Sequence, residues 1–275
     1  PSDFEIEVRE APEQALQLTA LSDSGSIPES LRVTALDDWK ACRLRFGLKH
    51  ALPWPAQRDD GAIRYEQLRG IFVHKVLEKT AQHMALPGQP VNQLQAWKQT
   101  LLDQAQRVWN KLELDDRATV YPFLKFFDQI VPRLAGKLME RQIQGWQFKG
   151  AEQQVEHTLV LQPSGASLAL KGRVDRLDTR GEALAISDIK FTNPAVLKKR
   201  LADPLSQPQL PAYQAMLNSP GAQLDFLGLH KDKVDWVSFP PLSNEFSEQG
   251  FKSWGEVLLS QLATELNSFF QGKAV

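Results

Sequence analysis

The sequence predicts a mixed α/β domain in which helices surround a central group of strands. Two observations support this prediction. Apolar residues recur with a helical period over 66–85 and over much of 92–146. After Gly145 the period changes to that of strands, and the last part of the chain alternates between the two patterns. Helices are therefore expected on the outside and strands in the middle.

The first 30 residues are acidic and polar, and we expect them to form a linker or tail. The chain begins with Pro1 rather than Met, which indicates a processed or excised piece of a longer protein. A short extended segment should follow. Thr34 can then N-cap a helix, which Pro53 and Pro55 would end. The folded domain is expected over 31–275.

Two further helical regions are expected. The first covers 66–85, because its apolar residues share one face, and Pro87 and Pro90 stop it. The second, over about 92–148, contains two helices whose apolar faces include Trp97, Leu101, Phe123 and Phe127, among others. This region is expected to be a helical insertion in the domain.

Strands are expected in the second half of the chain, with helices between and after them. The expected strands are 155–161, 168–177, 183–191, 224–229 and 234–239, and the expected helices are 208–217 and 246–270. A turn at 179–182 should join the second and third strands into a hairpin. With the turn centred between Arg180 and Gly181, Asp175 is expected opposite Ile186.

This hairpin carries the residues most suited to chemistry. Because strand side chains alternate, Asp175, Asp188 and Lys190 lie on one face. The two aspartates would be diagonal neighbours, about 7 to 8 Å apart. Two such carboxylates repel one another unless a cation lies between them. Mg²⁺ prefers oxygen ligands, and a lysine beside it could orient an attacking water. The alternative is a surface hairpin with scattered ion pairs.

Other residues are ambiguous when considered singly. His74 follows Gly70 on a helix, and a lone helical histidine is more often packed than a ligand. Gln209 and Tyr213 are four residues apart and share a helix face. Basic side chains also gather locally and could contact phosphates or simply face water. These are Lys198, Lys199 and Arg200, and the group Arg32, Lys40, Arg43, Arg45 and Lys49.

Composition excludes several classes of protein. The 275 residues are 42% hydrophobic and 24% charged, with a net charge of −1, which excludes a disordered chain. No apolar run approaches the roughly 18 residues that span a bilayer, so no membrane partner is expected. One cysteine cannot form a disulfide bridge within the chain. Because disulfides are typical of oxidising compartments, a cytoplasmic protein is expected. The sequence also has no Walker phosphate loop and no G-x-S-x-G elbow, so ATP hydrolysis and serine-hydrolase chemistry have no support.

Taken together, the motifs resemble those of the PD-(D/E)XK nuclease superfamily, in particular its RecB/AddB-like nuclease domains. Their order is that of the family. The matching segments are 36–46 (LDDWKACRLRF), 70–78 (GIFVHKVLE), 172–178 (GRVDRLD), 187–190 (SDIK) and 209–213 (QLPAY).

The resemblance implies a restriction-endonuclease-like core, in which a central mixed β-sheet is flanked by helices. It also implies roles for particular residues. His74, Asp175, Asp188 and the backbone carbonyl of Ile189 would bind Mg²⁺ or Mn²⁺, and Lys190 would position the attacking water. Gln209, Tyr213 and Glu152 would line the site, although Glu156 competes with Glu152 for the acidic position. The candidates for DNA contact are Arg43, Arg45, Arg173, Arg176, Lys198, Lys199 and Arg200.

The sequence departs from the family in three places. Many members carry an iron–sulfur cluster held by four cysteines, whereas Cys42 is the only cysteine here, so no such cluster is expected. Arg43 replaces the usual proline, and Phe191-Thr192 replaces a more frequent Thr-Gly. None of these changes removes an expected metal ligand.

The implied activity is metal-dependent hydrolysis of DNA phosphodiester bonds, of the exonuclease type, in repair or recombination. The domain would be the C-terminal module of a larger AddB-like protein, with an upstream helicase-like region as its partner. Two alternatives remain: a non-catalytic, nuclease-like module for DNA binding or scaffolding, and a metal-dependent phosphatase acting on small molecules. No feature of the sequence indicates a pocket for a small substrate.

Overall fold

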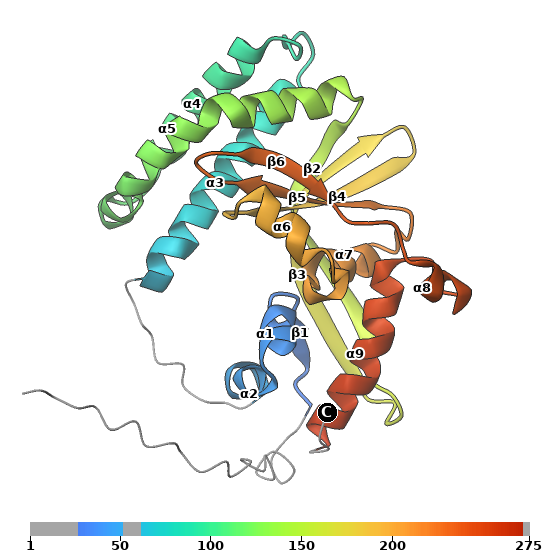
Figure 1. The fold of residues 1–275 in the computed structure, drawn as a ribbon. Helices are drawn as coiled ribbons and strands as arrows, with labels where there is room; N and C mark the ends of the chain where they lie inside the picture. The colour runs from blue at the N-terminus through green and yellow to red at the C-terminus, as the bar shows by residue number, and fades with distance from the viewer. Residues whose placement is uncertain (1–26, 52–61, 272–275) are drawn as a thin grey trace, which may run out of the picture.

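A mixed sheet of six strands forms the centre of the computed structural model, which describes residues 27–51 and 62–271 (Figure 1). The strand order is β1-β3-β4-β5-β6, with β2 also paired to β3. β1 runs parallel to β3 and β4 runs parallel to β5, whereas the other pairs are antiparallel. The strands are β1 (Ser30–Arg32), β2 (Gln147–Val160), β3 (Ser167–Arg180), β4 (Ala183–Lys190), β5 (Gln223–Leu229) and β6 (Val234–Ser238).

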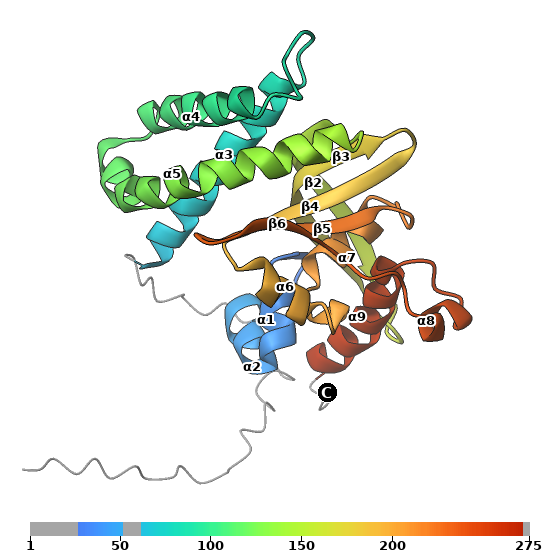
Figure 2. The same cartoon turned by 45° about the horizontal axis from the view of Figure 1, so that its top comes forward.

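Helices cover both faces of this sheet (Figures 1 and 2). One face carries α3 (Ala62–Met84), α4 (Leu94–Asn110) and α5 (Leu114–Ile143). The other face carries α1 (Ala35–Ala41), α2 (Arg43–Phe46), η2 (Gly47–Ala51), α6 (Pro194–Arg200), η3 (Pro204–Ser206), α7 (Gln209–Met216), α8 (Asn244–Glu248) and α9 (Trp254–Phe270). The predicted arrangement of a mixed sheet between helices is confirmed.

Alternation along the central strands explains the two layers. Ile186 on β4 and its partner Leu224 on β5 belong to the core beneath α1, α7 and α9. Ile189 and its partner Leu227 point the other way, into the core beneath α3 and α5. Because both faces are buried, these strands are nearly continuously apolar, as is typical of central strands. The polar residues that interrupt them therefore need a structural or chemical reason.

The helical region over 92–148 forms two helices as predicted, but two other expected helices are interrupted. The helix expected after Thr34 breaks at Cys42, whose backbone is extended (φ −165°, ψ 114°), and continues as α2 and η2. Thr34 precedes α1 without a capping side-chain hydrogen bond. The helix expected over 246–270 is divided into α8 and α9, with Gly250 at φ 91° between them. Pro53, Pro55 and most of the expected linker lie outside the described residues.

The β3–β4 hairpin forms with a register different from the predicted one. Arg180 pairs with Ala183, so the loop is Gly181-Glu182, and Ile186 pairs with Leu177 rather than with Asp175. The predicted pairing register is therefore wrong by two residues. An even shift keeps every side chain on its predicted face. Continued past the last pair, this register sets Asp175 directly opposite Asp188 instead of diagonal to it.

Within the described ranges, no helix is both long and apolar enough to cross a membrane.

Candidate active site

Two carboxylates meet where β3 and β4 leave their paired region. Asp175 Oδ2 accepts a hydrogen bond of 3.0 Å from the Ile189 backbone N–H, which fixes the side chain against β4. Asp188 is buried, with 6% of its surface exposed, and its Oδ2 lies 2.9 Å from Lys190 Nζ. That oxygen makes no hydrogen bond of good geometry, although it has almost no contact with solvent. A buried oxygen in this state is suited to a further ligand.

The electrostatics of this pair favour a cation. Burial and the neighbouring charge of Asp175 raise the pKa of Asp188 to about 7, although the Lys190 ammonium opposes this rise. Burial also disfavours ionisation of Asp175, but the hydrogen bond and charge of His74 outweigh it and hold the pKa of Asp175 below its usual range. A cation between the two groups would favour both ionised forms.

His74 and Glu152 complete the acidic cluster. The long helix α3 brings His74 Nδ1 to 3.4 Å from Asp175 Oδ1 and also to 3.4 Å from Glu152 Oε1. The three ligand atoms all lie within 4.8 Å of one another. Burial alone would lower the pKa of His74, but hydrogen bonds and charges from Asp175 and Glu152 raise it to about 10. The excess of negative charge thus attracts a proton to this point and would attract a divalent cation.

Glu152 reaches the cluster through an unusual backbone. Its φ of 55° lies in the left-handed region, which is costly for a residue other than glycine. The conformation interrupts the β2–β3 ladder between the pairs formed by Ala151 and Gln153. The carboxylate is then held by Arg173, whose Nε lies 2.7 Å from Oε2. Glu156, the competing candidate, is exposed and lies 3.8 Å from Lys171. The geometry therefore favours Glu152.

A chain of hydrogen bonds holds Lys190 in place. Its ammonium donates to Gln209 Oε1 at 2.7 Å, and Gln209 Nε2 donates to Asp37 Oδ2 at 2.6 Å. Burial would lower the pKa of Lys190, but the negative charges of Asp188, Asp37 and Asp175 raise it, so the side chain stays protonated. Sequence reasoning did not identify Asp37 as a site residue. Its place beside Gln209, 172 positions away, depends on how α1 packs on α7.

Tyr213 lies close to the backbone of β3. A Cβ on Gly172 would lie 2.5 Å from Tyr213 Cε1, so only glycine permits this approach. The ring lines the same cleft as Asp175, Asp188 and Lys190. Burial raises the pKa of the Tyr213 hydroxyl, which keeps it neutral. Gln209 and Tyr213 thus both lie at the cluster, whereas no contact made by the Ile189 carbonyl distinguishes it as a ligand.

The predicted DNA contacts separate into two groups. Arg176 is 8% exposed and its terminal nitrogen lies 2.8 Å from Asp178 Oδ1, which leaves little of its guanidinium accessible to DNA. Arg43 lies 3.5 Å above the Trp39 ring and 2.7 Å from Glu265, which directs its guanidinium to a structural role. The others are exposed, and three of them, Arg45, Arg173 and Arg200, line clefts next to the cluster. Lys198 lines a separate cleft, and Lys199 is exposed on the same helix.

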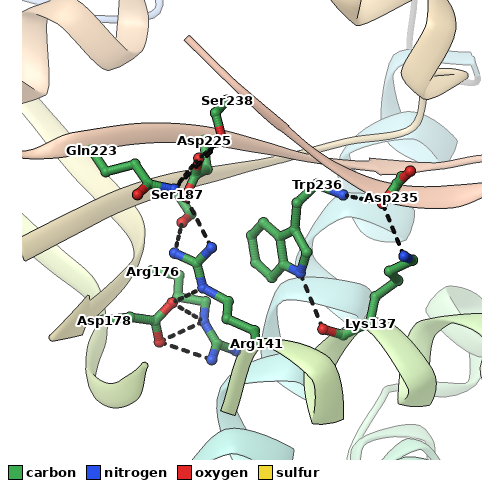
Figure 3. A network of polar contacts seen from close by, with 10 residues as sticks. All are labelled: Lys137, Arg141, Arg176, Asp178, Ser187, Gln223, Asp225, Asp235, Trp236 and Ser238. Atoms are coloured by element: carbon green, nitrogen blue, oxygen red, sulfur yellow. Dashed lines mark hydrogen bonds and ion pairs between the residues drawn. The ribbon is translucent and has the colours of Figure 1, made fainter. Parts of the chain in front are cut away.

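Behind the cluster, on the opposite face of the sheet, a buried arginine ties α5 to three strands (Figure 3). Arg141 Nε donates to Asp178 Oδ2 at 2.7 Å and one terminal nitrogen donates to Asp225 Oδ2 at 2.9 Å. The other terminal nitrogen donates to Ser187 Oγ at 3.3 Å, and the guanidinium lies 4.1 Å from the Trp236 ring centroid. Ser187 directly precedes Asp188, so this network holds the strand that carries the cluster.

The donor set fits a hard divalent cation. Carboxylate oxygens and one imidazole are common ligands of Mg²⁺ and Mn²⁺, and the buried Asp188 oxygen, which is paired with Lys190, lines the same cleft as His74 and Asp175. Within residues 27–51 and 62–271, His74, Glu152 and Asp175 form the one group of three or more such side chains close enough to bind one ion. The only cysteine, Cys42, is exposed and stands apart from this group.

Comparison with known proteins is consistent with this geometry. The family model of the PD-(D/E)XK nuclease superfamily matches residues 30–267. No curated protein matches. Among solved structures, one titled "Crystal structure of SSO0001" is similar at 13% identity over 72% of this chain and 87% of that one. Its TM-score of 0.29 is too low to support an argument. From the family match, this chain belongs to the PD-(D/E)XK nuclease superfamily.

Proposed function

We propose that this protein is a metal-dependent deoxyribonuclease that hydrolyses phosphodiester bonds at the cluster formed by His74, Glu152, Asp175, Asp188 and Lys190. One observation supports this most strongly: three ligand atoms lie within 4.8 Å of one another, beside a buried carboxylate oxygen whose close partner is the Lys190 ammonium at 2.9 Å. Membership in a nuclease superfamily supports the reaction class.

The chain's own residues then have distinct roles. His74, Glu152, Asp175, Asp188 and the Ile189 carbonyl would hold Mg²⁺ or Mn²⁺. When bound, the ion would supply Lewis-acid polarisation of the scissile phosphate and activation of the attacking water. Lys190 Nζ, fixed by Gln209, would orient that water and partly neutralise the phosphate charge. The raised pKa of Lys190 keeps its ammonium available as a hydrogen-bond donor.

The finer assignments follow from the motif order in the sequence. The order of the motifs at 36–46, 70–78, 187–190 and 209–213 supports a RecB/AddB-like subtype. We therefore propose an exonuclease-type role in DNA repair or recombination, in the cytoplasm, within a larger protein with a helicase-like region.

Incubation with linear DNA and Mg²⁺ tests this proposal. The wild type should degrade the DNA, and Lys190→Ala should reduce the rate by about 10²- to 10³-fold, the usual cost of losing one preorganised hydrogen-bond donor. Lys125→Ala, an exposed residue of α5, serves as the matched control. Equal rates for all three proteins, or no cleavage by any of them, would contradict the proposal and favour a non-catalytic module.

A further inference from the structure

A second cleft lies next to the candidate metal ligands, between α3, the C-terminal end of α4, and the edge formed by β2 and β3. Its volume is about 1140 Å³, and His74, Glu152 and Arg173 form the end nearest the cluster. We call it the α3/α4 cleft. The α4 side of this cleft belongs to the predicted helical insertion over about 92–148. The sequence indicated no function for that insertion.

The rim of the α3/α4 cleft is strongly basic. The cationic side chains are Lys75, Lys79, Arg107, Lys111 and Arg173, whereas Glu152 is the only carboxylate in the lining. The first two share one nearby acid, Glu78, at 2.7 and 3.6 Å. Arg107 and Lys111 form no ion pair within the described part of the chain. Their charge is therefore available to an anionic ligand.

Between these cations the floor of the cleft is apolar. Ile71 lines the cleft, and 57% of its surface is exposed. Val108 and Leu112 line the same cleft and are half-buried. A duplex presents only phosphates and groove edges to such a surface. A single strand presents phosphates together with unpaired bases, which gain from apolar contact.

The α3/α4 cleft adjoins a second cleft, which in turn adjoins a third. It shares His74 and Arg173 with the cleft of about 860 Å³ that contains Asp175 and Asp188. That cleft shares Lys190 with a third, of about 460 Å³. The third cleft is lined by Lys40, Arg45 and Arg200 together with the carboxylate of Asp37, and Arg45 Nε pairs with Asp38 Oδ1 at 2.7 Å. The acidic cluster thus lies in the middle of a groove with cationic surfaces on both sides.

We propose that single-stranded DNA occupies this groove, with its backbone on Lys79, Arg107 and Lys111, its bases on the Ile71 floor, and its continuation on Lys40 and Arg200. This inference rests on the proposed function for the identity of the polymer. The helical insertion is then one wall of the substrate path.

Binding measured without cleavage tests this proposal. In an Asp188→Asn background with EDTA present, fluorescence anisotropy is recorded with a labelled single strand and with a duplex of equal length. Three variants are compared: Lys79→Ala/Arg107→Ala/Lys111→Ala, Lys40→Ala/Arg200→Ala, and the control Lys98→Ala/Lys125→Ala/Lys252→Ala, whose residues line none of the three clefts. Circular dichroism melting confirms that each variant folds.

The single strand should bind at least about tenfold more tightly than the duplex. Each groove variant should raise the Kd, and the slope of log K against log salt should fall by about 0.7 for each lost phosphate contact, whereas the control variant should keep the parental slope. Groove variants that bind like the control, or tighter binding of the duplex, would overturn the inference. Because no step depends on cleavage, an inactive enzyme with these binding results would contradict only the proposed function.

Discussion

The Lys190 ammonium donates a hydrogen bond of 2.7 Å to the side-chain oxygen of Gln209. This contact joins the last residue of β4 to the first residue of α7 and fixes the only cation that touches Asp188 within the described residues. Gln209 is in turn oriented by Asp37 from α1. The position of the lysine is therefore set by the packing of two helices as well as by its own strand.

Removal of Gln209 should slow the reaction without removing the ion. We expect Gln209→Ala to lower kcat by about 10- to 100-fold, as is usual for a group that orients a reactive one, and to leave the affinity for Mn²⁺ nearly unchanged. The two quantities are measured by DNA cleavage and by calorimetry. Gln99→Ala, on the exposed side of α4, is the control. An unchanged kcat would show that Lys190 needs no such support.

Asp37 should position Lys190 through Gln209, in addition to the direct effect of its charge on the pKa of Lys190. Asp37→Asn retains an oxygen that can accept the Gln209 N–H, whereas Asp37→Ala does not. We therefore expect Asp37→Ala to lower kcat by about tenfold and Asp37→Asn to retain most of the activity. A dominant charge effect would instead make both variants equally slow, and this outcome would contradict the proposed hydrogen-bond chain.

Arg141 should be essential for stability. Arg141→Ala leaves the carboxylates of Asp178 and Asp225, both fully buried, without their shared partner. Loss of one member of a buried ionic network costs about 3 to 5 kcal/mol of unfolding free energy. Urea denaturation measures this change. Arg133→Ala removes an exposed arginine from the same helix and should cost less than about 1 kcal/mol. Similar losses for both variants would refute the role of the network.

Asp178 should contribute to acid unfolding. Burial would raise the pKa of Asp178, but the charges and hydrogen bonds of Arg176 and Arg141 outweigh it and hold this pKa below its usual range. The stabilisation from Asp178 is therefore fully present above its pKa in the unfolded chain, about 3.9. It is lost as the pH falls through the lower pKa that Asp178 has in the folded protein. Urea titrations at several pH values should show a steeper loss in the wild type than in Asp178→Asn. Parallel curves would contradict this assignment.

The close approach of Tyr213 to β3 gives a steric prediction. In Gly172→Ala the new Cβ would lie 2.5 Å from the Tyr213 ring and 2.9 Å from Val33 Cγ2. Overpacking of this kind costs about 1 to 3 kcal/mol, and displacement of the ring should also reduce cleavage. Gly150→Ala, whose Cβ meets nothing within 4 Å, is the control. Equal stability of the two variants would contradict the described contact.

Sequence periodicity predicted the layers well because it reports local burial. The hairpin face of Asp175, Asp188 and Lys190 could be predicted, since alternation survives an even register error. The register was missed, although Gly181, with φ 58°, occupies the first position of the two-residue loop, where such hairpins favour glycine. The burial of Arg176 was also missed. Its partner Asp178 was visible in the sequence, but the second arginine that joins them comes from α5, 37 positions before Asp178.

The binding of a divalent cation by the cluster can be measured directly. Calorimetric titration with Mn²⁺ should give one or two sites in the wild type with a Kd in the micromolar to millimolar range, and Asp175→Asn should weaken this binding at least about tenfold. Glu156→Gln, which changes an exposed acid on the same sheet, should bind as the wild type does. Absence of Mn²⁺ binding by the wild type, or equal binding by all three proteins, would contradict the account.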